Sequence, residues 1–201
     1  MSARLHGIVL AAGLSRRMGA FKPLLELAGR PVIAWAVSAL RAGGVSDVTV
    51  VIGHRADELR PLVAWMDARA VPNPDYEQGM YTSVRAGVAA LPAEARGFFL
   101  LPVDIPAVRP DTVRRLAAAR AAEPTAAAHI PTHGGRRGHP PLIAARLVPE
   151  ILGDEPPEGL RTILGGHADQ LRMVETEDPG VLLDLDRPED LAGVEALLRG
   201  R

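Results

Sequence analysis

Short, uninterrupted apolar runs alternate along this chain with longer segments in which apolar residues recur every three or four positions. The runs end in small residues or proline, and this pattern predicts strands that are buried on both faces. The periodic segments predict amphipathic helices. Strands are predicted at 7–12, 47–53, 97–106, 125–131, 141–145 and 181–186. Helices are predicted from Pro31 to Gly43, over 56–66, 80–91 and 109–122, and from Pro188 onwards.

This alternation predicts an α/β fold: a doubly wound, mainly parallel sheet with helices on both faces, of the Rossmann-like kind. A length of 201 residues without internal repeats or long linkers fits a single domain over 1–201. In such folds, ligands bind in the loops at the carboxyl ends of the strands. We therefore look for a site after the first strand and at the end of the 97–106 strand.

Composition excludes several classes of function. The formal net charge is −1 with both signs mixed, so no basic field indicates a nucleic-acid partner. The longest apolar stretches have the length of strands, and no membrane span is expected. The N-terminal stretch MSARLHGIVL lacks the features of a signal peptide. The absence of cysteine excludes disulfides and thiolate metal sites, and we expect a cytoplasmic protein.

The loop after the first predicted strand reads LAAGLSRRMGAFK and contains Gly13, Gly19, Arg16, Arg17 and Lys22. It matches neither the Walker A loop nor the GxGxxG pattern. Backbone amides at a glycine turn, with several cations nearby, nevertheless suit a polyphosphate. The alternative is a plain strand-to-helix turn with solvated arginines. Lys22 is the only lysine in the chain, and it offers a compact charge where arginine offers a planar fork.

Asp104, in LLPVDIP, is a second candidate. A carboxylate at the end of a buried strand is costly unless it is paired or binds a metal. Beside a polyphosphate loop, the metal that such an oxygen ligand suits is Mg²⁺, with Mn²⁺ as a substitute. The alternative is a turn cap before Pro106.

The segment NPDYEQGMYTSVRAG places Gly79 just before a helix whose first turn carries Thr82 and Ser83. Free amides and hydroxyls at this positive helix end would contact a nucleobase, a ribose or a phosphate, with Gly79 and Ser83 as candidates. Without further context, a simple N-terminal cap is the favoured interpretation.

Three histidines, His129, His133 and His139, invite a metal interpretation. Proline and glycine residues between them break any regular ligand spacing and no acidic residue is interleaved, so we do not expect zinc. We expect His139, in GHPPL, to border the binding cleft. Asp184 and Asp186 share one face if their segment is a strand, and one of them could be a second metal ligand. The favoured interpretation is that Asp186 starts the last helix.

Together these motifs resemble a known family. LAAGLSRRMG, KPLLEL, NPDYEQGMYTSVRAG, LPVDIP, GHPPL and LDLDRPEDL occur in order across nearly the whole chain. The pattern is similar to that of nucleotidyltransferases acting on molybdopterin, within the wider group that acts on sugar phosphates and isoprenoid precursors. Three of these motifs, NPDYEQGMYTSVRAG, GHPPL and LDLDRPEDL, resemble the narrower cytidylyltransferase branch. Ala12 also replaces a glycine typical of the guanylyl branch, and its methyl group would narrow the base pocket toward a pyrimidine.

The resemblance implies transfer of CMP from CTP to the terminal phosphate of molybdopterin, with release of pyrophosphate, in molybdenum cofactor maturation. It implies that backbone atoms of Leu10, Ala11, Ala12 and Gly13 contact the nucleotide. Arg17 and Lys22 would neutralise the triphosphate, Asp104 would hold Mg²⁺, and His139 would face the acceptor. A molybdoenzyme or its chaperone is a further expected, transient partner.

One departure leaves the acceptor open. The family often has Gly-Asp-Met-Pro where this chain has VDIP, so Val103 replaces a glycine. The alternatives are another nucleotide such as GTP, another phosphorylated acceptor, or a non-catalytic carrier of nucleotide or pterin. Lys22 and Asp104 together argue against the carrier, which needs neither.

Overall fold

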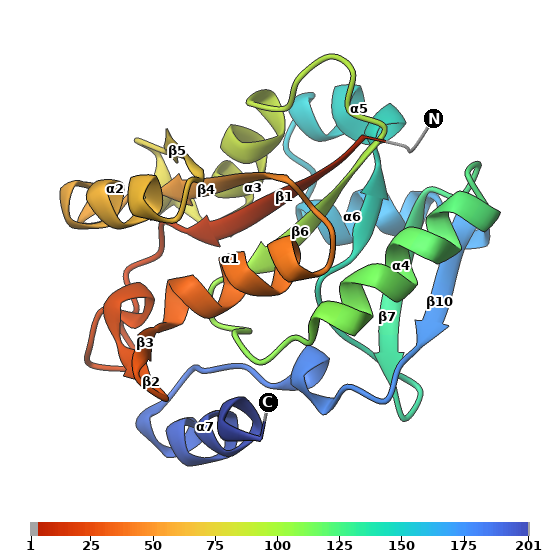
Figure 1. The fold of residues 1–201 in the computed structure, drawn as a ribbon. Helices are drawn as coiled ribbons and strands as arrows, with labels where there is room; N and C mark the ends of the chain where they lie inside the picture. Colours follow the sequence, from red (N-terminus) through yellow and green to blue (C-terminus); the bar gives the residue numbers. More distant parts are fainter. Residues whose placement is uncertain (1–3, 201) are drawn as a thin grey trace.

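The computed structural model describes residues 4–200, so the first three residues of the N-terminal stretch and Arg201 lie outside the described residues. Its central sheet has eight strands (Figure 1). In spatial order they are β10 (Leu171–Glu175), β7 (Ala128–His133), β9 (Leu142–Ala144), β6 (Gly97–Pro102), β1 (Leu5–Ala11), β4 (Asp47–Ile52) and β5 (Arg69–Pro72), with β8 (Arg136–Arg137) paired to β7.

Most neighbouring strands in this sheet are parallel. Strand β1 runs parallel to both β4 and β6, β4 to β5, and β10 to β7. Only β9, which is antiparallel to β6 and β7, and the short β8 depart from this direction within the described residues. The predicted mainly parallel sheet is confirmed, and the carboxyl ends of β1, β4 and β6 meet at one edge.

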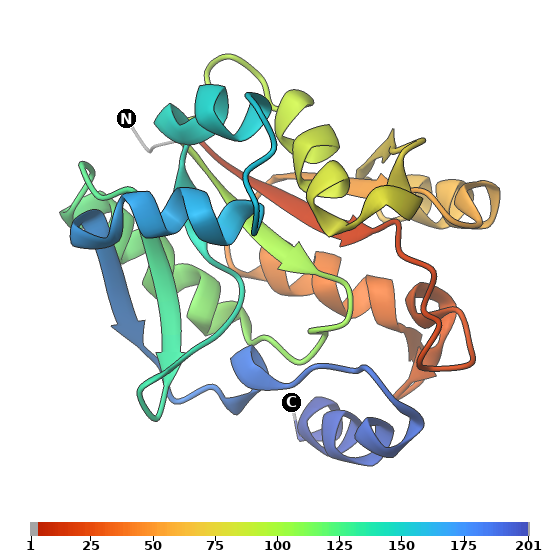
Figure 2. The same ribbon diagram turned by 180° about the vertical axis from the view of Figure 1, so that it is seen from behind.

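Helices cover both faces of the sheet (Figures 1 and 2). On one face lie α1 (Val32–Ala42), α2 (Ala56–Trp65) and α4 (Pro110–Ala122), with α7 (Leu191–Arg199) beside the small β2–β3 hairpin (Glu26–Leu27 and Arg30–Pro31). On the other face lie α3 (Met80–Ala89), α5 (Val148–Leu152) and α6 (Leu160–Gly166). None of the helices within residues 4–200 is long and apolar enough to cross a membrane.

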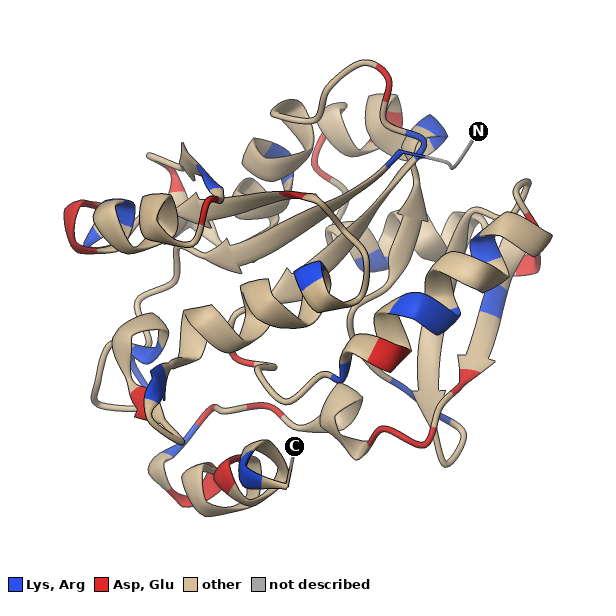
Figure 3. Cartoon of the chain, viewed as in Figure 1, with Lys and Arg blue, Asp and Glu red and all other residues tan. Residues whose placement is uncertain are grey.

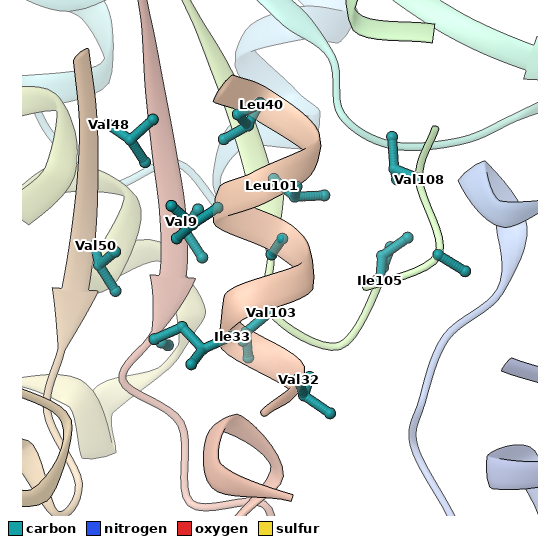
Figure 4. Close-up of a cluster of buried hydrophobic side chains, with 14 of the residues drawn as sticks. Val9, Val32, Ile33, Leu40, Val48, Val50, Leu101, Val103, Ile105 and Val108 are labelled. Atoms are coloured by element: carbon teal, nitrogen blue, oxygen red, sulfur yellow. The ribbon is translucent and has the colours of Figure 1, made fainter. Parts of the chain in front are cut away.

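Strand β1 is buried on both faces, as its continuous apolar sequence predicts. Val9 points toward α1 and packs with Ile33 and Leu40 of that helix (Figure 4). Its neighbours Ile8 and Leu10 belong to the core on the α3 side. Because alternate side chains anchor β1 from both sides, the loop that follows it begins at a rigid point.

The predicted strand at 181–186 is wrong. Residues Pro179–Leu182 form a 3₁₀ helix, and the chain continues without a sheet partner. The physical reason lies just upstream: Pro179 has no backbone donor, and the Asp178 side chain accepts a hydrogen bond from the Gly180 amide, which closes a turn. The apolar residues of this segment, such as Val181 and Leu185, are buried against the layers rather than in the sheet.

Several other boundaries also differ from the prediction. The strand predicted at 97–106 ends at Pro102, where the Ile105 amide turns back to bond the Pro102 carbonyl. The pattern missed the edge strands β5 and β10 and the short helices α5 and α6. These edge strands are partly exposed and carry charged residues, so they lack the apolar run that marks a central strand.

The segment after β10 crosses the carboxyl edge of the sheet, and we call residues 178–190 the C-terminal strap (Figure 1). Its anchor is the buried Asp178 carboxylate, which accepts hydrogen bonds from the Arg109 amide at 2.7 Å and the Thr112 hydroxyl at 2.7 Å. These two donors lie at the start of α4. Further along, the Leu185 amide donates to the Asp104 carbonyl at 2.7 Å. The strap is therefore tied to the end of β6.

Gly180→Ala should destabilise the fold. A Cβ at this position would lie 1.8 Å from the Ala107 carbonyl oxygen, which is backbone and cannot move aside cheaply. We expect a loss of about 2 kcal/mol in the free energy of unfolding, measured by urea denaturation. The matched control is Gly193→Ala in α7, where a Cβ meets nothing within 4 Å and alanine favours the helix. Equal stability of the two variants would contradict the tight strap contact.

Candidate active site

The loop after β1 forms a tight turn that places Lys22 at the carboxyl edge of the sheet. Ser15 and Gly19 both adopt a positive φ, at 53° and 70°. The Ser15 hydroxyl accepts a hydrogen bond from the Lys22 amide at 3.1 Å, and the Ser15 carbonyl accepts one from the Met18 amide at 3.1 Å. The short 3₁₀ helix Lys22–Leu24 starts at this point, with Pro23 in its first turn. The loop is thus held closed around the start of that helix.

The Lys22 ammonium lies between two carboxylates. Its Nζ atom is 2.7 Å from Asp186 Oδ1 and 3.4 Å from Asp104 Oδ2, and its side chain is only 8% exposed. The other oxygen of Asp186 is 2.9 Å from an Arg17 guanidinium nitrogen. The hydrogen bond from Lys22, supported by the Lys22 and Arg17 charges, lowers the pKa of Asp186. A buried cation is thereby paired from both sides, as its burial requires.

Three carboxylates, those of Asp104, Asp184 and Asp186, lie near one another, and Figure 3 shows acidic positions along the strap that carries the last two. Burial raises the pKa of Asp184, and the nearby carboxylates of Asp104 and Asp186 raise it further. Burial also lowers the pKa of His139, against the opposing effect of Asp184 and Asp104. Burial therefore disfavours the charged forms of both His139 and Asp184.

These carboxylates fit a hard divalent cation. Mg²⁺ is held in proteins by one or two carboxylates together with substrate phosphate oxygens. The like-charge repulsion that raises the pKa of Asp184 is what such a cation would relieve. Within residues 4–200, no three acidic or histidine side chains group as a complete ligand set. The donor set thus suits an ion whose remaining ligands come from a phosphate substrate.

A cavity of about 250 Å³ opens between the loop and the start of α3. It brings together most of the residues that the sequence singles out: Leu10, Ala12, Gly13, Arg17, Lys22, Gly79, Ser83 and Asp104. Ala11 does not line the cavity, and its side chain joins the core on the opposite face of the sheet. Loop, helix start and β6 end converge because all three lie at the same edge of a parallel sheet.

The floor of this cavity is tight around Ala12. The Ala12 carbonyl accepts a hydrogen bond from the His54 amide at 3.0 Å. A Cβ on Gly53 would approach the Ala12 methyl to 2.9 Å and the Tyr76 side chain to 2.8 Å. Only glycine fits at position 53 beside the Ala12 methyl group and Tyr76, both of which line the cavity.

Asn73 is a residue whose role the sequence did not reveal. Its buried side-chain amide donates to the Thr82 and Ser83 hydroxyls, at 2.9 Å each, and its oxygen accepts from the Asp75 amide. The Thr82 hydroxyl also bonds the Gly79 carbonyl at 2.9 Å, so Thr82 serves the turn. Ser83 both accepts from Asn73 and lines the cavity. The Asn-Pro pair at the loop start is a turn signal that could have indicated this role.

A second, larger cavity of about 690 Å³ adjoins the first and shares Leu10, Gly79 and Pro102 with it. His139 and Arg137 are among the residues that line this larger cavity. The other two histidines lie elsewhere: His129 is fully buried in β7, and His133 Nδ1 is 2.9 Å from the Thr176 carbonyl oxygen.

The favoured interpretation of Asp186 as the start of the last helix is wrong. The carboxylate of Asp190 performs that task by accepting from the Asp186 and Arg187 amides at 2.9 and 2.7 Å. The Asp186 side chain instead turns back to Lys22, a partner 164 positions away in the sequence. No local pattern could have shown this contact.

The glycine-bearing loop with Lys22, and the carboxylate that follows β6, lie at the carboxyl edge of a mainly parallel sheet, where α/β proteins bind their ligands. Residues 7–172 match the family model described as the MobA-like NTP transferase domain. The chain belongs to this family of nucleotidyltransferases.

Three relatives illustrate the family. The chain is 32% identical to the molybdenum cofactor cytidylyltransferase of Escherichia coli, over 91% of both proteins. It is 31% identical to nicotine blue oxidoreductase of Paenarthrobacter nicotinovorans, over 92% of this chain and 93% of that protein. Among solved structures, a nucleotidyl transferase from Methanothermobacter superposes with a TM-score of 0.83 at 29% identity, covering 98% of this chain and 99% of the other.

Asp186→Asn should destabilise the protein because it weakens the pairing of a buried lysine. Hydrogen bonds to charged groups contribute about 1.5–3 kcal/mol, and we expect a loss in this range in urea denaturation. Asp67→Asn is the control, since the Asp67 side chain is 97% exposed and its contact with Arg41 spans 3.6 Å. If Asp186→Asn is as stable as the control, the Lys22–Asp186 pair does not hold the site together.

Proposed function

We propose that this protein transfers CMP from CTP to the terminal phosphate of molybdopterin and releases pyrophosphate. The observation that carries the proposal is the Lys22 ammonium beside Asp104 in the smaller cavity, which adjoins a larger one. The similarity to a molybdenum cofactor cytidylyltransferase over nearly the whole chain supports it.

The reaction requires positioning and charge neutralisation rather than covalent catalysis. A terminal phosphate oxygen of the acceptor attacks the α-phosphorus of CTP in line. The bond between the α-phosphorus and the oxygen bridging to the β-phosphate breaks, and pyrophosphate leaves with that electron pair. Lys22 stabilises the charge that gathers at the α-phosphate, and Arg17 neutralises the outer phosphates.

Mg²⁺, or Mn²⁺ in its place, would be held by Asp104 and would supply positive charge toward the phosphate oxygens. Asp186 keeps Lys22 and Arg17 in place before the nucleotide arrives. The triphosphate then competes with the Asp186 carboxylate for the same two cations. Backbone amides of the loop, around Gly13, add neutral donors to this charge balance.

The choice of CTP rests on Ala12. Ala12 lines the cavity together with Tyr76, and its methyl group takes up space that a glycine would leave open. A pyrimidine fits beside this methyl group more easily than a purine does.

The larger cavity would take the acceptor. His139 and Arg137 line this cavity and would contact a pterin ring or its polar substituents. Val103, in place of the family's usual glycine, lines the smaller cavity at the end of β6. Molybdopterin is proposed as the acceptor because a relative is a molybdenum cofactor cytidylyltransferase and because the larger cavity has the size of a small-molecule site.

The competing functions are the same chemistry with GTP or another phosphorylated acceptor, and a non-catalytic carrier of nucleotide or pterin. The similarity to nicotine blue oxidoreductase, at 31% identity over 92% of this chain, keeps such alternatives open. We expect a cytoplasmic protein that contacts a molybdoenzyme or its chaperone transiently.

Lys22→Ala should lower kcat roughly 100-fold, the scale observed when one preorganised charge-stabilising donor is removed. Asp104→Asn should also reduce turnover, and added Mg²⁺ should not restore it. The measurement is pyrophosphate release over the four nucleotides, with and without molybdopterin. Arg60→Gln, at an exposed position on α2, is the control and should keep wild-type turnover. Wild-type rates in both site variants would refute the mechanism, and no release with any nucleotide would favour the carrier.

His139→Ala should raise the KM for molybdopterin and leave the KM for CTP near its wild-type value. The reason is that His139 lines the larger cavity and not the smaller one. Steady-state kinetics with each substrate varied in turn separates the two effects. A raised KM for CTP with an unchanged KM for the acceptor would reverse the assignment of the two cavities.

A further inference from the structure

A third cavity lies at the opposite edge of the sheet from the candidate active site. It has a volume of about 550 Å³ and lies where β6 begins and β9 ends, beside α5. Figures 1 and 2 show α5 next to α3 and far from α7 and the C-terminal strap. Its apolar wall consists of Val88, Leu91, Pro92, Val148, Pro149 and Leu152.

Three arginines, Arg96, Arg120 and Arg146, share this cavity. Arg120 and Arg146 donate only to neutral oxygens: Arg120 to the Ala126 and Arg96 carbonyls, and Arg146 to the Thr125 carbonyl and the Gln170 side chain. The Arg96 guanidinium has no hydrogen bond or ion pair among residues 4–200. No carboxylate in the described chain lies within ion-pair distance of any of the three.

The nearby carboxylates are engaged elsewhere. Glu94 pairs with Arg4 at 2.5 Å, and Glu123 pairs with Arg172 at 2.5 Å. Burial lowers the pKa of Arg120, and the like charge of Arg146 lowers it further. Three arginines thus line one cavity without a carboxylate partner; Arg96 and Arg146 are exposed, and Arg120 is partly buried beside the like charge of Arg146. An anion in the cavity would offset this repulsion.

We propose that this cavity binds a small anionic molecule, in which a phosphate or carboxylate group is attached to an apolar body. The guanidinium groups would hold the oxyanion, and the wall of valine, leucine and proline side chains would cover the body. The volume is that of a small-molecule site rather than of a protein interface. The site is separate from the proposed nucleotidyl-transfer chemistry and does not depend on it.

Helix α3 extends from the candidate active site to the third cavity. Its first residues line the candidate active site, and its last turn, at Val88 and Ala89, lines the third cavity. In addition, the Tyr81 hydroxyl and the Arg85 guanidinium donate to the Ile151 and Leu152 carbonyls at the end of α5. A ligand in the third cavity therefore contacts a helix whose other end shapes the nucleotide pocket.

The probe is phenyl phosphate, titrated into ¹⁵N-labelled protein and followed by amide chemical shifts. We expect saturable shifts at Arg96, Arg146, Val148 and Leu152, weaker binding of inorganic phosphate, and no saturation with benzyl alcohol. Benzoate distinguishes a carboxylate-binding site from one that needs a phosphate. Shifts confined to the loop around Lys22 would overturn the proposal, because that loop is the other anion site.

Arg96→Gln is the test variant, since its side chain makes no hydrogen bond in the described structure and its loss should leave the fold intact. We expect it to weaken phenyl phosphate binding at this cavity about tenfold, while shifts near Lys22 remain as in the wild type. Arg60→Gln removes an equally exposed arginine from α2 and should change neither set of shifts. Wild-type affinity in Arg96→Gln would refute the site, whatever the outcome of the transferase assays.

Discussion

The organisation of this protein depends on one buried cation. The Lys22 ammonium lies between the carboxylates of Asp104, at the end of β6, and Asp186, in the C-terminal strap. A lysine with 8% exposure is tolerated only with such partners. The pairing joins three segments from the beginning, middle and end of the chain. It thereby connects the folding of the strap to the shape of the smaller cavity.

The strap itself depends on contacts away from the site. The Asp178 carboxylate bonds the start of α4, and Gly180 passes so close to the Ala107 carbonyl that no larger residue fits. These contacts set the path along which Asp184 and Asp186 reach the carboxyl edge. The raised pKa of Asp184 and the lowered pKa of Asp186 follow from this placement. The pKa values of these two carboxylates thus depend on the packing of the strap against α4 and the Ala107 carbonyl.

The sequence predicted the mainly parallel α/β fold because buried central strands such as β1 and β6 carry clear apolar runs. The family was predicted from the resemblance of motifs that occur in order along the chain. The sequence also selected residues that the structure gathers around one cavity, although their roles stay predictions. It failed on the strap, where apolar residues pack between layers instead of in a sheet. It also failed on Asp186 and Asn73, because a contact between distant segments and a side-chain cap leave no periodic signal.

The strap also affects where this protein can be divided. The family model ends at residue 172, within β10 and before Asp178. A fragment cut at that boundary would retain the glycine-bearing loop, Lys22 and Asp104, and by sequence matching alone it would count as a complete domain. It would lack α7 and both late carboxylates, and it would leave a buried lysine with half of its counter-charge. The segment covered by the family model is therefore shorter than the segment needed to pair Lys22 with both of its carboxylates.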